Sequence, residues 1–204
     1  TLDVDGGTIK LDGNYPVGTQ NVALGDTALD SVAADGNYNT AIGHASLTAN
    51  TTGDTNSALG RESLLSNTTG SSNTAVGYTA LLNNTTASYN TAVGYQAAYS
   101  ITGSQYNTAI GRGALYSHTT GNGGNVAVGY DANRSLTTGS NNVSVGANAA
   151  YAMTTGLYNV ALGGNALRSN TTASNNTAVG YQAAYSNTTG TEVTAVGKSA
   201  MSSN

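Results

Sequence analysis

The chain alternates aliphatic or β-branched residues with alanine in a short unit that recurs along most of its length. Asn73-Thr74-Ala75-Val76-Gly77 is a typical copy. The copies begin at Asn21, Asn39, Asn56, Asn73, Asn90, Asn107, Asn125, Asn142, Asn159, Asn176 and Val193. Eight of the ten intervals between them are 17 residues long, and the other two are 18. Since a constant period in this range is typical of stacked repeats, the sequence predicts about eleven coils, here called rungs, of 17 residues.

We number the positions of each repeat from zero at its first residue. Position one is Val or Thr with one Ser, position two is Ala except at Ser144, position three is Val, Ile or Leu, and position four is always Gly. These residues favour a short strand that ends at a sharp turn with positive φ or a close backbone contact. A second strand is expected over positions five to nine, followed by a return turn such as Asn-Thr-Thr-Gly at 67–70. Each repeat would then be one coil of an all-β parallel solenoid.

The alternation places positions one and three on one face of the strand and position two on the other. Each coil holds few large apolar side chains, so we expect Val and Leu to fill its interior. The small alanines would then face outward and let another chain approach closely in an oligomer. The candidate interface residues are Ala41, Ala58, Ala75, Ala92, Ala109, Ala127, Ala161 and Ala178.

The units Asn-Thr-Ala-Val-Gly-Tyr-Gln-Ala-Ala-Tyr at 90–99 and 176–185 resemble the head repeats of trimeric autotransporter adhesins of the YadA type. They are still more similar to the longer repeats of phage tail fibres, especially those of marine and cyanobacterial phages. Residues 8–18 are similar to the segment that leads into the repeats of such fibres, so the resemblance covers 8–204. It implies a left-handed parallel β-roll with three chains around a threefold axis. The adhesin repeat is shorter, so a collagen-binding role is not carried across.

Composition narrows the alternatives. The 204 residues include no Trp, Phe or Cys, and charged residues make up only 8%. Such polar sequence is often disordered, but a disordered chain has no need of β-branched residues in a fixed register. The net charge of −4 argues against a nucleic-acid partner. The sequence contains no run of 18 apolar residues, so we expect no membrane insertion. Residues 1–20 lie outside the register and are expected to form an N-terminal β cap or connector before the β-roll domain of 21–204.

Tyrosines and charged residues share two further positions of the repeat, which indicates solvent-facing columns. The candidate surface contacts are Tyr78, Tyr95, Tyr130 and Tyr181 with Arg61 and Arg112 at position five, and Tyr99, Tyr116, Tyr151 and Tyr185 at position nine. Four more tyrosines immediately precede a repeat. The columns could stack on sugar rings of a cell envelope, or the rings could simply cover strand edges and grooves between subunits.

No pattern of catalytic, cofactor-binding or metal-binding residues emerges, so we expect no enzyme. His44 and His118 occupy different repeat positions, and Glu62 and Glu192 have no partner at a fixed spacing. The acidic residues of the first segment, Asp3, Asp5 and Asp12, lack the spacing of a calcium-binding loop. Asn-Thr-Thr at 50, 67, 84, 170 and 187 matches a glycosylation site, but Asn and Thr also form turns.

Three functional hypotheses follow. The first is a structural and host-attachment module of a phage tail fibre on the virion, a homotrimer that contacts other tail proteins and a host surface glycan or envelope protein. The second is the head of a bacterial trimeric adhesin at the cell surface. The third is an ice-binding solenoid that uses the adjacent threonines of positions twelve and thirteen, although ice binders need a flat Thr-x-Thr face.

Overall fold

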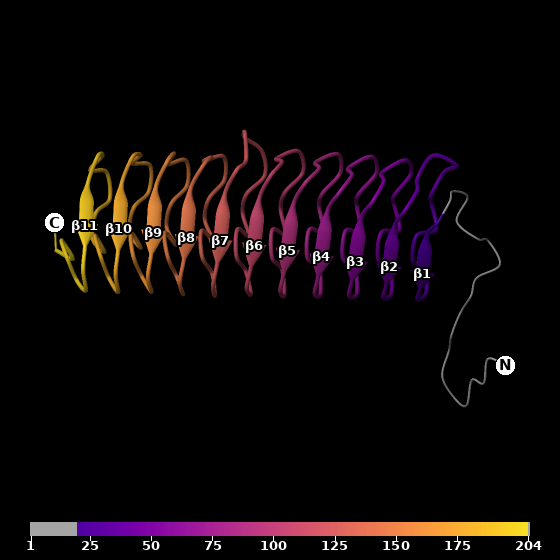
Figure 1. The fold of residues 1–204 in the computed structure, drawn as a ribbon, viewed down its shortest axis with the longest axis horizontal. Coiled ribbons are helices and arrows are strands. Elements are labelled where there is room, and N and C mark those ends of the chain that lie inside the picture. Colours follow the sequence, from indigo (N-terminus) through magenta and orange to yellow (C-terminus); the bar gives the residue numbers. More distant parts are fainter. Residues whose placement is uncertain (1–19, 204) are drawn as a thin grey trace, which may run out of the picture.

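A computed structural model describes residues 20–203, and within that range the chain forms one elongated stack of coils without a helix (Figure 1). The predicted cap over 1–20 and the acidic residues Asp3, Asp5 and Asp12 lie outside the described residues, except for Gln20. Each coil contributes one strand, and the strands lie side by side along the long axis of the molecule (Figure 1). The predicted all-β solenoid is confirmed.

Every strand is three residues long and occupies positions one to three of its repeat. The strands are β1 (Val22–Leu24), β2 (Thr40–Ile42), β3 (Ser57–Leu59), β4 (Thr74–Val76), β5 (Thr91–Val93), β6 (Thr108–Ile110), β7 (Val126–Val128), β8 (Val143–Val145), β9 (Val160–Leu162), β10 (Thr177–Val179) and β11 (Thr194–Val196). They form one parallel sheet in sequence order. Equal positions pair across rungs, as Ala75 does with Ala92. The extra residue of the repeat at 107–124 is taken up in a loop that projects between β6 and β7 (Figure 1).

The structure reverses the predicted faces of the strand. From Ala41 to Ala195 the position-two alanines are buried inside the coil, while the residues at positions one and three are half-buried or exposed. The opposite wall explains this, because it already contributes large buried side chains such as Leu47, Leu64 and Leu81 to the same core. A thin coil filled from one side has room for only a methyl group from the other. The prediction that the position-two alanines face outward is therefore wrong, and the following residues lie inside the coil: Ala41, Ala58, Ala75, Ala92, Ala109, Ala127, Ala161 and Ala178.

The expected second strand is absent from the described coils. Positions six and eight have positive φ, for example 55° at Gln96 and 52° at Ala98, so the backbone cannot extend there. This wall is nevertheless bonded between rungs. The Leu47 N–H donates to the Ser63 carbonyl at 3.0 Å, and the Ala45 N–H donates to the Asp26 carbonyl at 2.9 Å. N–H groups of this wall thus donate alternately to the following rung and to the preceding rung. These bonds replace the regular ladder of a sheet.

The prediction for the position-four glycines is confirmed. All eleven have φ between 119° and 137°. A Cβ built on Gly94 would lie 2.6 Å from the carbonyl oxygen of Gly111, the equivalent glycine of the next rung. Only glycine allows this backbone conformation together with so close an approach of two rungs.

A ladder of buried asparagines holds the rungs together, and the sequence analysis missed it. The position-zero residues from Asn39 to Asn176 are buried. The Asn73 backbone N–H donates to Oδ1 of Asn56 at 3.0 Å, and Asn73 Nδ2 donates to the Ala87 carbonyl at 2.9 Å. A second, shorter ladder joins Asn67 Nδ2 to Asn50 Oδ1 at 2.7 Å. Each rung thus satisfies polar groups of its neighbour inside the core, where unpaired amides would be costly.

The second ladder also explains why Asn-Thr-Thr, which matches a glycosylation site, recurs in the chain. The asparagines of the five Asn-Thr-Thr matches are all buried in the stack: Asn50, Asn67, Asn84, Asn170 and Asn187. Their side-chain amides are used inside the coil, so the motif arises from turn and core chemistry in the folded chain.

Candidate functional site

The turn at the position-four glycine directs position five out of the stack. Tyr78, Tyr95, Tyr130 and Tyr181 are exposed there, as are Arg61 and Arg112. The position-nine residues Tyr99, Tyr116, Tyr151 and Tyr185 are half-buried. Both columns of candidate contacts therefore reach the surface, and the column at position five is the more accessible.

The position-five side chains of five successive rungs stack into one row. The guanidinium of Arg61 lies 5.5 Å from the ring centre of Tyr78, and the rings of Tyr78 and Tyr95 are 5.6 Å apart. Arg112 follows, 5.9 Å from the centre of Tyr95 and 5.1 Å from that of Tyr130. Stacking with aromatic rings orients these guanidinium groups along the rod.

A second row runs along position nine. Tyr99 and Tyr116 stack with ring centres 5.0 Å apart, and Arg134 lies 4.7 Å from the centre of Tyr116. Further along, Arg168 lies between Tyr151 and Tyr185, at 5.3 and 5.8 Å from their ring centres.

This stacking limits how sugars could contact the rows. In a pair such as Tyr78 and Tyr95, with rings inclined by only 16°, each tyrosine covers one face of the other. The rows therefore present ring edges, hydroxyl groups and guanidinium groups outward. A ring face remains open only where the neighbouring rung carries a small residue.

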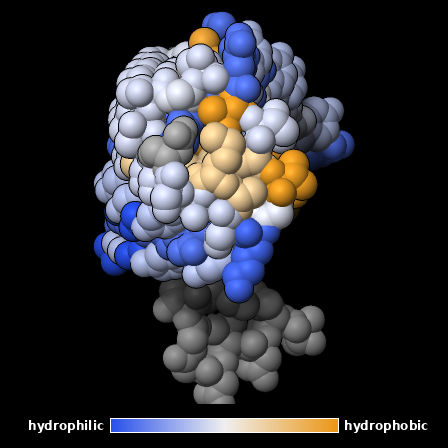
Figure 2. Space-filling view, turned by 90° about the vertical axis from the view of Figure 1, so that its left-hand side faces the viewer, coloured by the Kyte–Doolittle hydropathy of each residue, from blue (hydrophilic) through white to orange (hydrophobic). Residues whose placement is uncertain are grey.

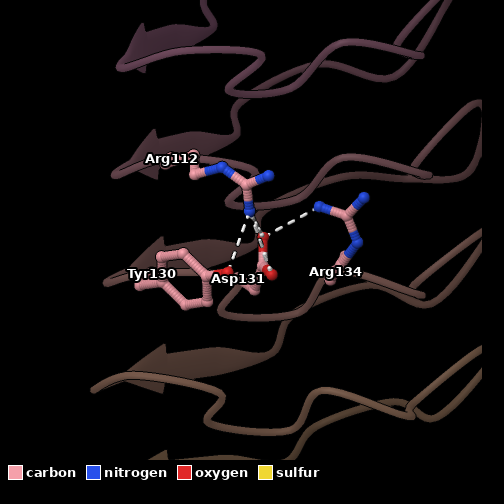
Figure 3. A network of polar contacts seen from close by, with 4 residues as sticks. All are labelled: Arg112, Tyr130, Asp131 and Arg134. Atoms are coloured by element: carbon pink, nitrogen blue, oxygen red, sulfur yellow. Dashed lines mark hydrogen bonds and ion pairs between the residues drawn. The ribbon is translucent and has the colours of Figure 1, made fainter.

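Asp131 joins the two rows, as Figure 3 shows. Asp131 is only 6% exposed, and its Oδ1 lies 2.8 Å from Nη1 of Arg134. Nη1 of Arg112 is 3.5 Å from both carboxylate oxygens and donates to the Tyr130 hydroxyl at 3.1 Å. We call Tyr95, Arg112, Tyr116, Tyr130, Asp131 and Arg134 the arginine cluster.

Gly113 creates the space for this carboxylate. It occupies position six of the preceding rung, and a Cβ there would lie within 2.2 Å of Asp131 Oδ1 and 2.6 Å of Arg134 Nη1. Among the described repeats, Gly113 is the only glycine and Asp131 the only aspartate at position six. This paired exception, one rung apart, was a signal in the sequence that the analysis of columns overlooked.

The two histidines lie apart, as their positions predict. His118 is buried and shares a 2.8 Å hydrogen bond through Nε2 with Ser104 Oγ. Burial lowers the pKa of His118 to about 4. His44 is exposed, with Nε2 3.9 Å from Asp26. Glu62 pairs with Arg61 at 2.8 Å. Within residues 20–203, no three potential metal ligands gather.

The strand face forms a second distinctive surface. Position three is aliphatic in every repeat, position one is Val, Thr or Ser, and neither carries a charge. Several of these side chains are exposed, including Val196 at 67% in the last rung and Ile110 at 39% in the middle of the stack, and most of the others are half-buried. Seen from the β11 end, the stack shows hydrophobic patches among mostly hydrophilic residues (Figure 2).

No helix in the described part of the chain is long and apolar enough to cross a membrane. Comparisons with protein-family models, with curated proteins and with solved structures find no match.

Proposed function

We propose that this chain forms a trimeric, non-enzymatic rod in a phage tail fibre, where it extends the fibre and presents its surface rows to the host. The observation that carries the proposal is the unbroken register of eleven parallel strands. With a spacing of about 4.8 Å between rungs, such a stack is a rigid rod roughly 50 Å long. A rod of this kind suits a part whose task is to hold a contact surface at a fixed distance from the virion.

The exposed strand face supports association with further copies of the same chain. It is uncharged and partly aliphatic along the whole stack, which is the character of a surface covered by a partner. Its side chains repeat with every rung, about 4.8 Å apart. A parallel copy aligned with this chain offers the same period, so equal rungs can pack against one another from end to end. The number of three copies comes from the resemblance to fibre and adhesin repeats.

Three aligned copies would display each Tyr/Arg row three times. Weak contacts of each row with a host surface glycan or envelope protein would then add up through multivalency. The long, 17-residue rung favours the fibre over the adhesin head, whose repeat is shorter. Other tail proteins would be the remaining partners of this segment.

Two experiments test the proposal. Antibodies raised against the purified rod should label the tail fibres of the virions whose genome encodes this chain, and labelling of a bacterial surface instead would overturn the fibre assignment. In addition, the purified rod should bind host cells and compete with virion adsorption. If host cells bind the full fibre but not the rod, and Tyr95→Ala with Tyr181→Ala leaves adsorption unchanged, the segment only spaces the fibre.

A further inference from the structure

We propose that the arginine cluster is a binding site for an acidic polysaccharide, and that Asp131 holds its two arginines ready for the anionic groups. This inference rests on the proposed contact with a host glycan and specifies the chemical class of that glycan. It starts from a concentration of positive charge: among the described residues, every lysine and arginine stands at position five or nine. These residues are Arg61, Arg112, Arg134, Arg168 and Lys198.

The arginines of the cluster are oriented before any ligand arrives. Arg112 lies between the rings of Tyr95 and Tyr130, and Arg134 lies against Tyr116. The shared carboxylate of Asp131 then fixes both guanidinium groups toward the gap between the rows (Figure 3). Because these side chains are already ordered, binding an anion costs little further rotamer entropy.

The local charge and exposure leave capacity for a ligand anion. Two guanidinium groups face one carboxylate, so the cluster keeps a positive charge. The side chain of Arg112 is 48% exposed and that of Arg134 is 28% exposed. Each guanidinium carries five N–H donors, of which Asp131 and Tyr130 use few. The remaining donors suit the paired oxygens of a carboxylate or sulfate group.

An open aromatic face lies beside this charge. The row at position five continues after Tyr130 with Ala147 and Gly164, so no large side chain of the row follows Tyr130 in the next two rungs. Tyr130 is 50% exposed, and Arg112 covers the opposite side of its ring. A sugar ring seated over Ala147 could pack on Tyr130 while its acidic group reaches Arg112.

The spacing along the rod suits an extended polysaccharide. Arg134 and Arg168 share position nine two rungs apart, which corresponds to about 10 Å. That distance is close to the length of a disaccharide in an extended chain. Arg168 donates to the Tyr185 hydroxyl at 3.4 Å and has no acidic partner in the part of the chain that the structure describes. A polymer with an acidic group on alternate sugars would therefore meet successive arginines.

The overall charge favours such a polymer over nucleic acid. The chain carries ten acidic residues against six basic ones, and its net charge is −4. A nucleic acid has one phosphate per nucleotide and needs a broad positive surface. Here the positive charge is confined to narrow rows, which matches a polymer with sparse charges.

The test uses hyaluronan, which carries a carboxylate on alternate sugars, with neutral dextran and single-stranded DNA as comparison polymers. We expect the purified rod to bind hyaluronan in a salt-sensitive manner, and to bind dextran and DNA at least about tenfold more weakly. Arg112→Gln combined with Arg134→Gln should weaken hyaluronan binding about tenfold or more. Lys198→Gln is the control, because it removes a positive charge in the last rung, outside the arginine cluster and outside the stacked row from Arg61 to Tyr130, and it should leave binding unchanged.

Three further variants separate a positioned site from simple charge attraction. Asp131→Asn raises the net charge, so attraction alone would strengthen hyaluronan binding, whereas a site positioned by Asp131 is weakened. Gly113→Ala should also weaken binding, because its Cβ displaces the carboxylate while the backbone tolerates alanine; Ala45 has φ 55° at the same position. Ala147→Tyr extends the row with the residue that four other rungs carry there, and it should block the sugar seat.

The binding results test the polysaccharide site separately from the tail-fibre proposal. Tighter binding by Asp131→Asn, equal binding by the double arginine variant, or DNA binding as tight as hyaluronan binding would each overturn it. Melting curves of every variant show whether a loss of binding reflects a loss of fold. Attachment of the wild-type rod to host cells without hyaluronan binding leaves the fibre proposal standing and removes this one.

Discussion

At the scale of single residues, exceptions to the repeat occur in matched pairs. Ser144 is the one residue at position two that is not alanine, and Asn133 is the one asparagine at position eight. They lie in adjacent rungs, both buried, and Ser144 Oγ donates to Asn133 Oδ1 at 2.8 Å. Among the described residues, Asn133 Nδ2 has no hydrogen-bond partner. The two polar residues compensate one another in a core that is otherwise apolar at these positions.

This pairing predicts non-additive stability effects. Ser144→Ala alone should lower the free energy of unfolding by about 1–2 kcal/mol, because it leaves the buried Asn133 carbonyl without a donor. Asn133→Leu alone should also destabilise the chain, since it leaves the buried Ser144 hydroxyl unpaired. The double variant restores the usual Ala and Leu and should be at least as stable as the wild type. Denaturant unfolding of all four proteins checks this, and purely additive changes would contradict it.

His118 gives the rod a predictable response to acid. It stands where five other described rungs carry asparagine, and its pKa is lowered by burial from 6.5 to about 4. The unfolded chain therefore binds a proton near pH 6.5, whereas the folded chain stays neutral until about pH 4. The stability that depends on neutral His118 is fully present above pH 6.5 and declines as the pH falls toward 4.

His118→Asn should remove this part of the pH dependence. The loss between pH 6.5 and 4 amounts to at most roughly 3 kcal/mol for the wild type. Acidic residues contribute equally to both proteins, so the difference between their unfolding free energies isolates the histidine. Parallel stability curves across this range would show that folding leaves the pKa of His118 unchanged and would contradict the prediction.

At the scale of strands and turns, alternation in the sequence predicted the strands but not their orientation. Val76 and Ala75 alternate in the same way whichever of them faces the core, because a period of two is symmetric between the faces. The deciding factor is the opposite wall, where Leu64 and Leu81 already fill the coil. That wall is itself not a strand, and its positive φ values have no marker in residue types such as Leu and Gln.

The asparagine ladder was missed for a related reason. Asn73 precedes a strand and Asn67 begins a return turn, so both fit the usual preference of asparagine for turns. Their burial follows from stacking, since each amide bonds to the next rung. The arginine cluster was also missed, because its residues come from different repeat positions in neighbouring rungs. No single repeat position, considered by itself, reveals it.

The turn glycines allow a test with a built-in control. Gly94→Ala should lower the free energy of unfolding by about 3 kcal/mol, because the added Cβ meets the Gly111 carbonyl at 2.6 Å and φ is 137°. Gly103→Ala should be neutral or slightly stabilising, because no atom lies within 4 Å of its Cβ position and its φ is not in the left-handed region. Equal unfolding midpoints for both variants would contradict the requirement for glycine at position four.

At the scale of the whole molecule, the register makes a face as long as the rod. Position-three residues Leu24 and Val196, at the two ends of the stack, belong to the same uncharged strip and are both exposed. A single chain would leave this strip in water. The outward rows at positions five and nine, by contrast, carry the charges and hydroxyl groups expected of a surface that stays hydrated.

The trimer prediction therefore concerns the strand face. Ile110→Asp places a charge in the middle of the strip and should convert the assembly to folded monomers, because an unpaired charge in an apolar interface is costly to bury. Tyr78→Asp, at position five and similarly exposed, should remain trimeric. Ala75→Leu should instead disrupt the coil itself by overpacking its interior.

Light scattering with far-ultraviolet circular dichroism separates the three results. A wild-type monomer with an intact fold would refute the trimer, and an Ile110→Asp protein that stays trimeric would move the interface to another face.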